Sequence, residues 1–232
     1  MNSEENFMSR VLVIGDTHAP AMREGYVDFL REIYGSWNCD RVVHIGDVVD
    51  FGAISYHEKD PESPSPIEEF RKAKEQVAEL YSAFPDAVVM TGNHDALPRR
   101  KATTIGIPNN LIREYSDIWE TPRWEWRPRF STYSIDGVLY AHGDRGKGGI
   151  NAAMKNAKDH FASWVQGHLH GQGGVTYFAN ESTIIFGMSV STGIDIDSLA
   201  MKYGQKFNQK PLVGCGVVLD GVHAIYEPMR IS

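Results

Sequence analysis

The chain has 232 residues, of which 42% are hydrophobic and 23% are charged. A chain of this length and composition can bury a sizeable core, which excludes a wholly disordered protein. Its formal net charge of -7 excludes a protein that coats nucleic acid through overall positive charge, but it leaves room for a local basic surface.

Two cysteines, Cys39 and Cys215, form neither a CxxC pair nor a zinc-ribbon spacing. We interpret them as reduced, buried thiols. The sequence shows no signal peptide and no run of about 20 apolar residues that would span a membrane. We therefore expect a soluble, cytoplasmic protein without a membrane partner.

The first half of the chain alternates short apolar runs with helical patterns. Apolar residues recur at spacings of three and four over residues 26–37, which is typical of an amphipathic helix. A second helix is predicted over residues 66–84, with Ser65 as its N-cap, Glu68 as the capping-box acid and Ile67 on its buried face. The apolar runs are Val11–Ile14, Val42–Ile45 and Ala87–Met90. Strand, helix and strand in this order predict parallel βαβ units.

The segment 97–130 is basic, in contrast with the acidic chain around it. It holds seven basic and four acidic residues, which leaves a local net charge of +3. We interpret it as an insertion over one edge of a single domain that spans residues 1–232, partly helical around Asn110–Asp117. Its tryptophans are Trp119, Trp124 and Trp126. They either pack the insertion onto the core or offer aromatic faces on which bases stack.

The second half of the chain predicts a different sheet. Its apolar runs are Val138–Ala141, Ser163–Val165, Thr183–Phe186, Val213–Leu219 and Val222–Tyr226. Asp136-Gly137 and Asp220-Gly221 lie between apolar residues and are typical of hairpin turns, which join antiparallel strands. The expected fold class is therefore α/β, a four-layer αββα sandwich of two mixed β-sheets flanked by helices.

Polar side chains follow five apolar runs at the point where each run ends. The five segments are Gly15-Asp16-Thr17-His18, Gly46-Asp47-Val48-Val49-Asp50, Gly92-Asn93-His94-Asp95, His142-Gly143-Asp144 and Gly167-His168-Leu169-His170. In an open α/β sheet, ligands bind beyond the carboxyl ends of the strands, so these side chains should converge at one rim. An ordinary turn explains each segment alone, but not all five in this order, each at a strand end.

The converging residue types favour a pair of metal ions. Carboxylate, imidazole and amide oxygen ligands suit manganese, iron, zinc and related ions. The set is too large for one ion, and two ions roughly 3.5–4 Å apart form a known clamp for phosphoryl displacement. The residues thus predict a metal-dependent phosphoester hydrolase.

In these five blocks the sequence resembles the calcineurin-like metallophosphoesterase superfamily, whose pattern is GD-x-H, GD-x-x-D, GNH-D/E, a lone His and GH-x-H. The resemblance spans Gly15 to His170. It implies the four-layer fold and a dinuclear metal site. It implies Asp16, His18 and His170 as ligands of one ion, Asn93, His142 and His168 as ligands of the other, and Asp47 as the bridge between them.

The resemblance also implies roles for residues around the ions. His94 is expected to be the general acid that protonates the leaving group. Asp95 is expected to orient His94 by accepting its ring proton, and Asp50 to support the site without binding metal. The remaining histidines are expected in other places: His44 in the core, and His160 and His223 in surface or structural positions.

One departure concerns an arginine that grips phosphate in many protein phosphatases of this superfamily. Phe51 stands where that arginine would follow GD-x-x-D, and GNHD replaces the GNHE of the Ser/Thr phosphatases. Both differences disfavour a protein phosphatase. We expect Arg99, Arg100 or Lys101 to supply the missing charge, and His57 to reach the substrate.

Three functions remain open at this point. A phosphodiesterase or nuclease acting on nucleic acid or a nucleotide is favoured by the basic, tryptophan-bearing segment and by the nuclease branch of the superfamily, whose members favour manganese. A small-molecule phosphomonoesterase suits the acidic charge. A non-catalytic metal-binding scaffold is disfavoured by the complete ligand set. The expected cofactors are two divalent ions, manganese first, with iron, zinc, nickel or magnesium as alternatives.

Overall fold

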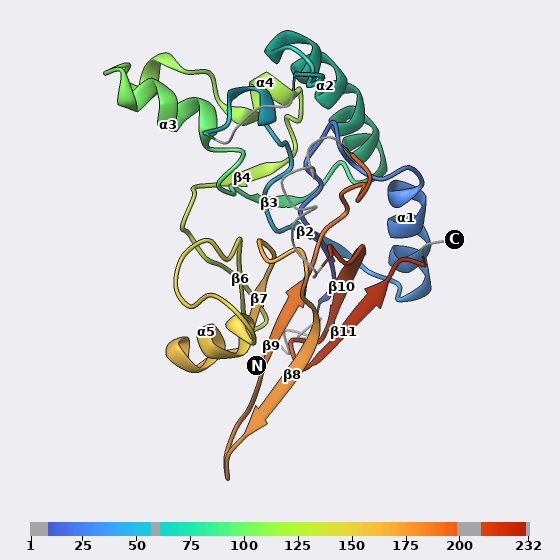
Figure 1. Cartoon of the computed structure of the whole chain (residues 1–232). Helices are drawn as coiled ribbons and strands as arrows, with labels where there is room; N and C mark the ends of the chain where they lie inside the picture. Colours follow the sequence, from blue (N-terminus) through green and yellow to red (C-terminus); the bar gives the residue numbers. More distant parts are fainter. Residues whose placement is uncertain (1–8, 57–60, 199–209, 231–232) are drawn as a thin grey trace, which may run out of the picture.

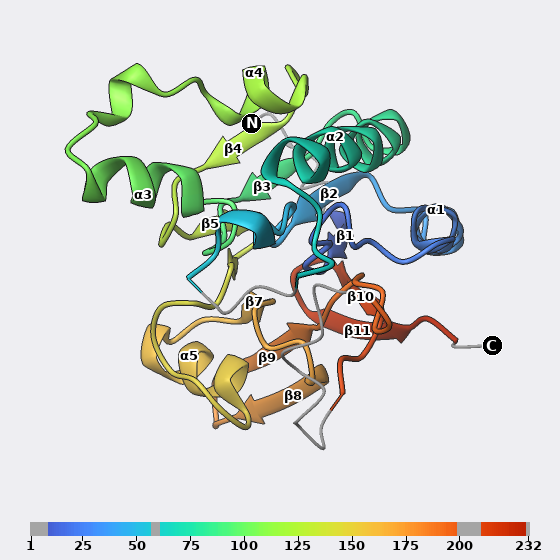
Figure 2. The ribbon, with the colours of Figure 1, turned by 45° about the horizontal axis from the view of Figure 1, so that its top comes forward.

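Two mixed β-sheets, one of six strands and one of five, pack face to face with helices on their outer sides (Figures 1 and 2). This computed structural model describes residues 9–56, 61–198 and 210–230. Helices α1 (Tyr26–Ser36) and α2 (Pro66–Ala83) cover the six-stranded sheet, and α5 (Ala152–His160) covers the five-stranded sheet. The α/β sandwich of two mixed sheets predicted from the sequence is confirmed.

The six-stranded sheet has the strand order β11-β10-β1-β2-β3-β4. Its strands are β1 (Arg10–Ile14), β2 (Arg41–His44), β3 (Val88–Met90), β4 (Glu125–Arg127), β10 (Gly214–Leu219) and β11 (His223–Pro228). Strands β1 to β3 run parallel, as predicted, and β4 continues the parallel order, whereas β10 runs antiparallel to both β1 and β11. The carboxyl ends of β1, β2 and β3 therefore lie along one rim.

The five-stranded sheet has the order β5-β6-β7-β9-β8. Its strands are β5 (Tyr133–Ile135), β6 (Val138–Ala141), β7 (Trp164–Gln166), β8 (Gly173–Ala179) and β9 (Ile184–Val190). Strands β6, β7 and β9 are parallel, and the edge strands β5 and β8 are antiparallel to their neighbours. Both predicted hairpins are present, and all four residues of their turns have φ between 49° and 77°.

Strand β1 shows how both faces of the six-stranded sheet become buried. Leu12 and Ile14 pack against α1 and α2, whereas Val11 and Val13 pack against the five-stranded sheet. Successive residues of a strand point to opposite faces, so a sheet covered on both sides needs apolar residues at every position. This requirement explains why the sequence shows a continuous apolar run here instead of an alternating pattern.

Helix α2 differs from its prediction on the buried face. Ser65 and Glu68 form the expected capping box, but the prediction for Ile67 was wrong, because its side chain is 71% exposed. The face that packs against the core carries Val77 and Leu80, and two turns earlier the same face carries Glu69, which is only 6% exposed. The buried face of α2 thus includes a charged residue that the sequence pattern did not place there.

The segment 97–130 contains α3 (Leu97–Thr104), the 3-10 turn η2 (Asn109–Leu111), α4 (Tyr115–Trp119) and β4. Its last part is an edge strand of the six-stranded sheet, because β4 pairs with β3. The helical stretch predicted around Asn110–Asp117 is divided between η2 and α4. No helix in the described part of the chain has both the length and the apolarity that a membrane span requires.

The three tryptophans of this segment pack onto the protein. Trp119 and Trp124 are 2% and 4% exposed and belong to the core beneath α2. The indole N–H of Trp124 donates to the carbonyl oxygen of Phe84 at 2.8 Å, and that of Trp126 donates to the hydroxyl of Thr121 at 3.1 Å. Of the two interpretations of these residues, the structure therefore supports packing.

Replacing Trp119 by alanine should lower the free energy of unfolding by about 3–5 kcal/mol, because the indole fills a buried space against the rings of Phe51 and Phe70. Urea denaturation followed by circular dichroism measures the change. Leu111→Ala is the matched control in the same segment, since Leu111 is 73% exposed and should change stability by no more than about 0.5 kcal/mol. Equal effects of the two substitutions would contradict the packing described here.

Candidate metal centre

The predicted metal-ligating residues converge at the rim where the two sheets meet. Three groups of three side chains each bring one ligand atom from every member within 4.8 Å of the others, and one of them is His18, Asp50 and His94. The other two consist entirely of predicted metal ligands. The first of these two groups is Asp16, His18 and His170; the second is Asp47, His142 and His168. Each of these two groups combines residues that follow strands of the six-stranded sheet with residues that follow strands of the five-stranded sheet. The centre therefore lies across the interface between the two sheets.

In the first group, ring nitrogens and a carboxylate point at a common space. The Nε2 atoms of His18 and His170 are 3.2 Å apart, and Nε2 of His170 is 3.1 Å from Oδ2 of Asp16. Nδ1 of His18 donates to Oδ1 of Asp50 at 2.8 Å, which leaves the Nε2 lone pair of His18 free to bind a cation. Two imidazole nitrogens and a carboxylate oxygen in this arrangement suit a divalent transition metal.

The second group is arranged in the same way. Nδ1 of His142 donates to the carbonyl oxygen of Ile45 at 3.1 Å, which leaves Nε2 to face Asp47 Oδ2 at 3.2 Å and Asn93 Oδ1 at 3.0 Å. Asn93 thus lies beside this group, as expected from its motif. Oδ2 of Asp47 is also 3.7 Å from Nε2 of His18, a member of the first group. Asp47 accordingly lies between the two groups.

Two features show that this space fits positive ions. Oδ1 of Asp16 is buried and has no hydrogen-bond partner among the described residues; the ring nitrogen Nδ1 of His142 lies 3.9 Å away. A buried carboxylate oxygen without a hydrogen bond is unfavourable unless positive charge compensates it. Two glycines make room for the carboxylates. A Cβ on Gly167 would lie 2.2 Å from Oδ1 of Asp16, and one on Gly92 would lie 2.1 Å from Oδ1 of Asp47.

Three of the converging residues adopt a backbone conformation that side chains other than glycine rarely take. His18, Asp47 and His168 have φ of 48°, 48° and 65°. Such left-handed residues cost about 1–3 kcal/mol each and tend to cluster at functional sites. Here they turn the chain sharply at the strand ends and aim the side chains into the shared space.

His94 lies beside the two groups and is oriented by Asp50. Its Nδ1 donates to the backbone oxygen of Asp50 at 2.7 Å and lies 3.1 Å from Oδ1 of the same residue. The expectation that Asp95 accepts this proton is not met. The carboxylate of Asp95 accepts from the backbone N–H groups of Gly92 and Val49 at 2.9 and 3.2 Å and thereby joins two motif turns. The motif pattern gave no signal for this exchange of roles.

The buried charges of the site perturb one another strongly. Burial alone would lower the pKa of His142 and His94, but the negative charge of Asp47 raises the pKa of each to about 10. Burial would raise the pKa of Asp47, and the positive charge of His142 lowers it well below its usual range. Burial and the charge of Asp47 raise the pKa of Asp95 to about 7. Without metal, protonated histidines therefore balance the carboxylates.

The residues expected to contact substrate lie in three different situations. Arg99 forms an ion pair with Glu114 at 2.9 Å and is thus engaged within its own segment. Arg100 and Lys101 lie over the ring of Tyr56, at 5.4 and 4.1 Å from its centroid. His57, also expected to contact substrate, lies outside the described residues.

His44 is a core residue, as predicted. It is 1% exposed, its Nε2 is 3.1 Å from the hydroxyl oxygen of Thr17, and its Nδ1 accepts from the N–H of Gly46 at 3.2 Å. Burial lowers the pKa of His44 to about 3. The ring is therefore neutral and occupied by internal hydrogen bonds.

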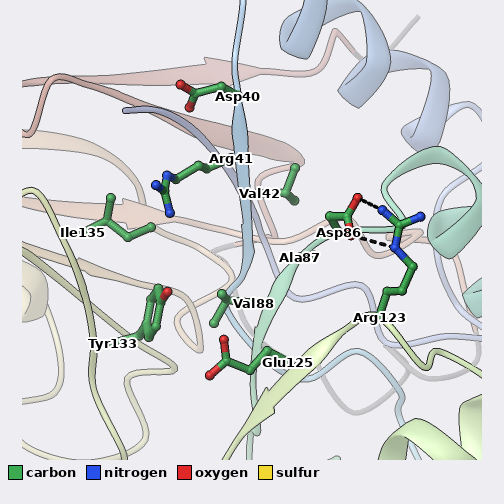
Figure 3. Close-up of a pocket in the computed structure, with 10 residues that line it drawn as sticks. All are labelled: Asp40, Arg41, Val42, Asp86, Ala87, Val88, Arg123, Glu125, Tyr133 and Ile135. Carbon is green, nitrogen blue, oxygen red and sulfur yellow. Dashed lines mark hydrogen bonds and ion pairs between the residues drawn. The ribbon is translucent and has the colours of Figure 1, made fainter. Parts of the chain in front are cut away.

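A cavity of about 440 Å³ lies away from this chemistry (Figure 3). Its walls include Arg41, Val88 and Glu125, at or near the amino ends of β2, β3 and β4. The converging ligands follow the carboxyl ends of the strands, so this cavity lies at the opposite end of the sheet. Arg123 and Asp86 close one side of it with an ion pair.

Comparison with known proteins gives one match in sequence. A family model described as calcineurin-like phosphoesterase matches residues 9–186. No curated protein matches the chain.

Several solved structures are similar in fold. Vacuolar protein sorting 29 from Cryptosporidium parvum is 14% identical, with a TM-score of 0.47 over 96% of this chain and 98% of that one. The phosphoesterase Yfce from E. coli is 11% identical, with a TM-score of 0.42 over 90% and 87%. The nuclease MPE from Pseudomonas putida is 12% identical, with a TM-score of 0.36 over 94% and 87%. At these identities the similarities concern the fold alone.

Substituting Gly167 by alanine should weaken metal binding by about 10–100-fold, because the new methyl group would displace the Asp16 carboxylate. Titration calorimetry with Mn²⁺ and metal analysis of the purified variant measure the loss. Gly148→Ala is the matched control, since a Cβ at Gly148 meets nothing within 4 Å. Unchanged affinity in Gly167→Ala would show that Asp16 does not contribute to the metal site.

Proposed function

The chain belongs to the calcineurin-like phosphoesterase family, and we propose that it is a dinuclear metal-dependent phosphodiesterase that acts on nucleic acid or a nucleotide. The observation that carries the proposal is the position of Asp47 between two groups of ligand atoms, each of which suits one divalent ion. A single structural ion would need neither the second group nor a shared carboxylate.

In this proposal the side chains divide between the two ions as the sequence motifs implied. Asp16, His18 and His170 hold one ion, Asn93, His142 and His168 hold the other, and Asp47 bridges them. When bound, the ion pair supplies a nucleophile at neutral pH and neutralises charge on the phosphate oxygens. Manganese is the ion we expect first, because members of the nuclease branch of the superfamily favour it, although the ligands suit iron and zinc as well.

His94 is proposed as the general acid. Its Nδ1–H is held by Asp50, so Nε2 is the ring atom available to a leaving group. In the protein without metal, the negative charge of Asp47 and the contacts with Asp50 raise the pKa of His94 and favour the protonated ring, and an acid must carry its proton before it can donate it. A non-catalytic scaffold would have no use for an oriented imidazole beside its metal ligands, which argues for an enzyme.

Two features support a substrate with a large organic group on the phosphate. A cavity of about 310 Å³ adjoins His142 and is lined also by Phe130, Arg145 and Trp164. On α3, which begins three residues after His94, Arg100 and Lys101 present positive charge beside the exposed ring of Tyr56. Cations and an aromatic face are the groups that contact a nucleic acid backbone and its bases.

The proposal predicts metal-dependent cleavage of phosphodiesters. With Mn²⁺ present, the protein should hydrolyse bis-para-nitrophenyl phosphate and labelled single-stranded DNA faster than para-nitrophenyl phosphate. Asp47→Asn should nearly abolish all turnover, because it weakens the contact shared by both ions. Turnover is followed by nitrophenolate absorbance and by gel electrophoresis of the DNA. Hydrolysis of the monoester alone would instead establish a phosphomonoesterase.

Replacing His94 by glutamine should retain metal yet lower kcat by about 10²–10⁴-fold, because the leaving group then departs without a proton donor. The loss should be largest for substrates with poor leaving groups. The wild-type rate should fall as pH rises through the pKa of His94, since the ring then loses its proton, and the variant should lack this alkaline fall. Metal depletion in the variant would contradict the division between ligand and acid.

A further inference from the structure

Glu69 is a buried carboxylate outside the proposed metal centre. It lies in the first turn of α2 and is 6% exposed. Its Oε1 accepts from the N–H of Gly52 at 2.7 Å, and its Oε2 accepts from the N–H of Ala53 at 3.0 Å. A buried carboxylate is unfavourable unless hydrogen bonds satisfy it. These two bonds fasten η1 (Gly52–Ile54) to α2.

The fastened turn is folded tightly around the carboxylate of Asp50. Phe51, which links Asp50 to the turn, has φ of 51° and ψ of 32°, a left-handed conformation that an aromatic residue rarely adopts. A Cβ at Gly52 would lie 2.5 Å from Oδ2 of Asp50. Such a conformation persists only where surrounding contacts enforce it. The two hydrogen bonds to Glu69 are such contacts.

Asp50 in turn contacts the rings of two residues of the site. Its Oδ1 lies 2.8 Å from Nδ1 of His18 and 3.1 Å from Nδ1 of His94, and its backbone oxygen accepts from the same nitrogen of His94. A small displacement of Asp50 would therefore change the orientation of a proposed metal ligand and of the proposed acid together. The contacts that hold the turn after Asp50 oppose such a displacement.

We propose that Glu69 is a positioning residue that holds the turn after Asp50, and through it the rings of His94 and His18. The contacts run without interruption from α2 through the Glu69 carboxylate and the backbone of Gly52 and Ala53 to Asp50. The geometric part of this inference stands on these contacts alone. Its consequence for turnover rests on the proposed function.

The neighbouring Glu68 provides a matched control. It belongs to the same helical turn, but its carboxylate accepts from Ser65 at the helix terminus, and among the described residues no hydrogen bond joins it to η1. Glu68→Ala therefore weakens the start of α2 without touching the turn that holds Asp50. Glu69→Gln keeps the size of the side chain but replaces one of the two acceptor oxygens with a donor amide, which meets a backbone N–H.

The test compares wild type, Glu69→Gln, Glu69→Ala and Glu68→Ala in two measurements. The first is the ¹H–¹⁵N spectrum of the histidine rings in metal-free protein, with the His94 Nδ1 proton assigned by its absence in His94→Gln. The second is kcat and KM for bis-para-nitrophenyl phosphate with Mn²⁺. We expect both Glu69 variants to lose the hydrogen-bonded His94 proton and to lower kcat by about 10–100-fold at unchanged KM. Glu68→Ala should keep both.

Several outcomes would overturn the inference. They are a retained His94 proton and kcat in Glu69→Gln, equal losses in Glu68→Ala, or no hydrogen-bonded His94 proton in wild type. If wild type hydrolyses no phosphoester, the proposed function fails, yet the spectra still decide whether Glu69 positions His94. If Glu69→Ala does not fold, Glu69→Gln still provides both measurements.

Discussion

The site depends on the burial of Asp16 and Asp47 between two sheets, where each is at most 1% exposed. Carboxylates removed from water are strongly unfavourable unless positive charge or hydrogen-bond donors surround them. The backbone N–H of His168 donates to Asp16, and that of His94 donates to Asp47. The remaining negative charge holds the pKa of His142 at about 10. The same charge gives the space its affinity for cations.

The ligand groups span the interface between the two sheets, so the core determines their geometry. Val13 and Val43 of the six-stranded sheet pack against Val165 of the five-stranded sheet in the layer beneath the site. Any change in this packing would alter the distance between the ligands that follow β1 and β2 and those that follow β6 and β7. A metal ion that binds the assembled site would also stabilise the folded chain.

The convergence of these side chains requires strained backbone conformations at the strand ends. Positive φ angles occur at three candidate ligands, His18, Asp47 and His168. A fourth occurs at Phe51, directly after Asp50, which supports the site. Regular strand geometry would carry these residues past the rim instead of turning them into it. Such conformations require neighbouring contacts that enforce them. At Phe51 these contacts include the packing of its ring against Trp119.

The sequence by itself determined the features that depend on near neighbours in the chain. Apolar runs that end in glycine and polar residues located β1, β2, β3, β6 and β7 and the candidate ligands that follow them. Ser65 and Glu68 located the start of α2, and the two Asp-Gly pairs located the hairpins. Each of these patterns is set by backbone geometry over a few residues, which a sequence displays directly.

Only the tertiary structure decided which distant groups meet. It showed that Asp50, and not Asp95, orients His94, that Arg99 pairs with Glu114, and that Glu69 is buried. It also showed the short strands β4 and β5, whose three residues each are too few for a periodic pattern. These contacts follow from the packing of α2 and the motif turns against one another, and no spacing along the chain encodes that packing.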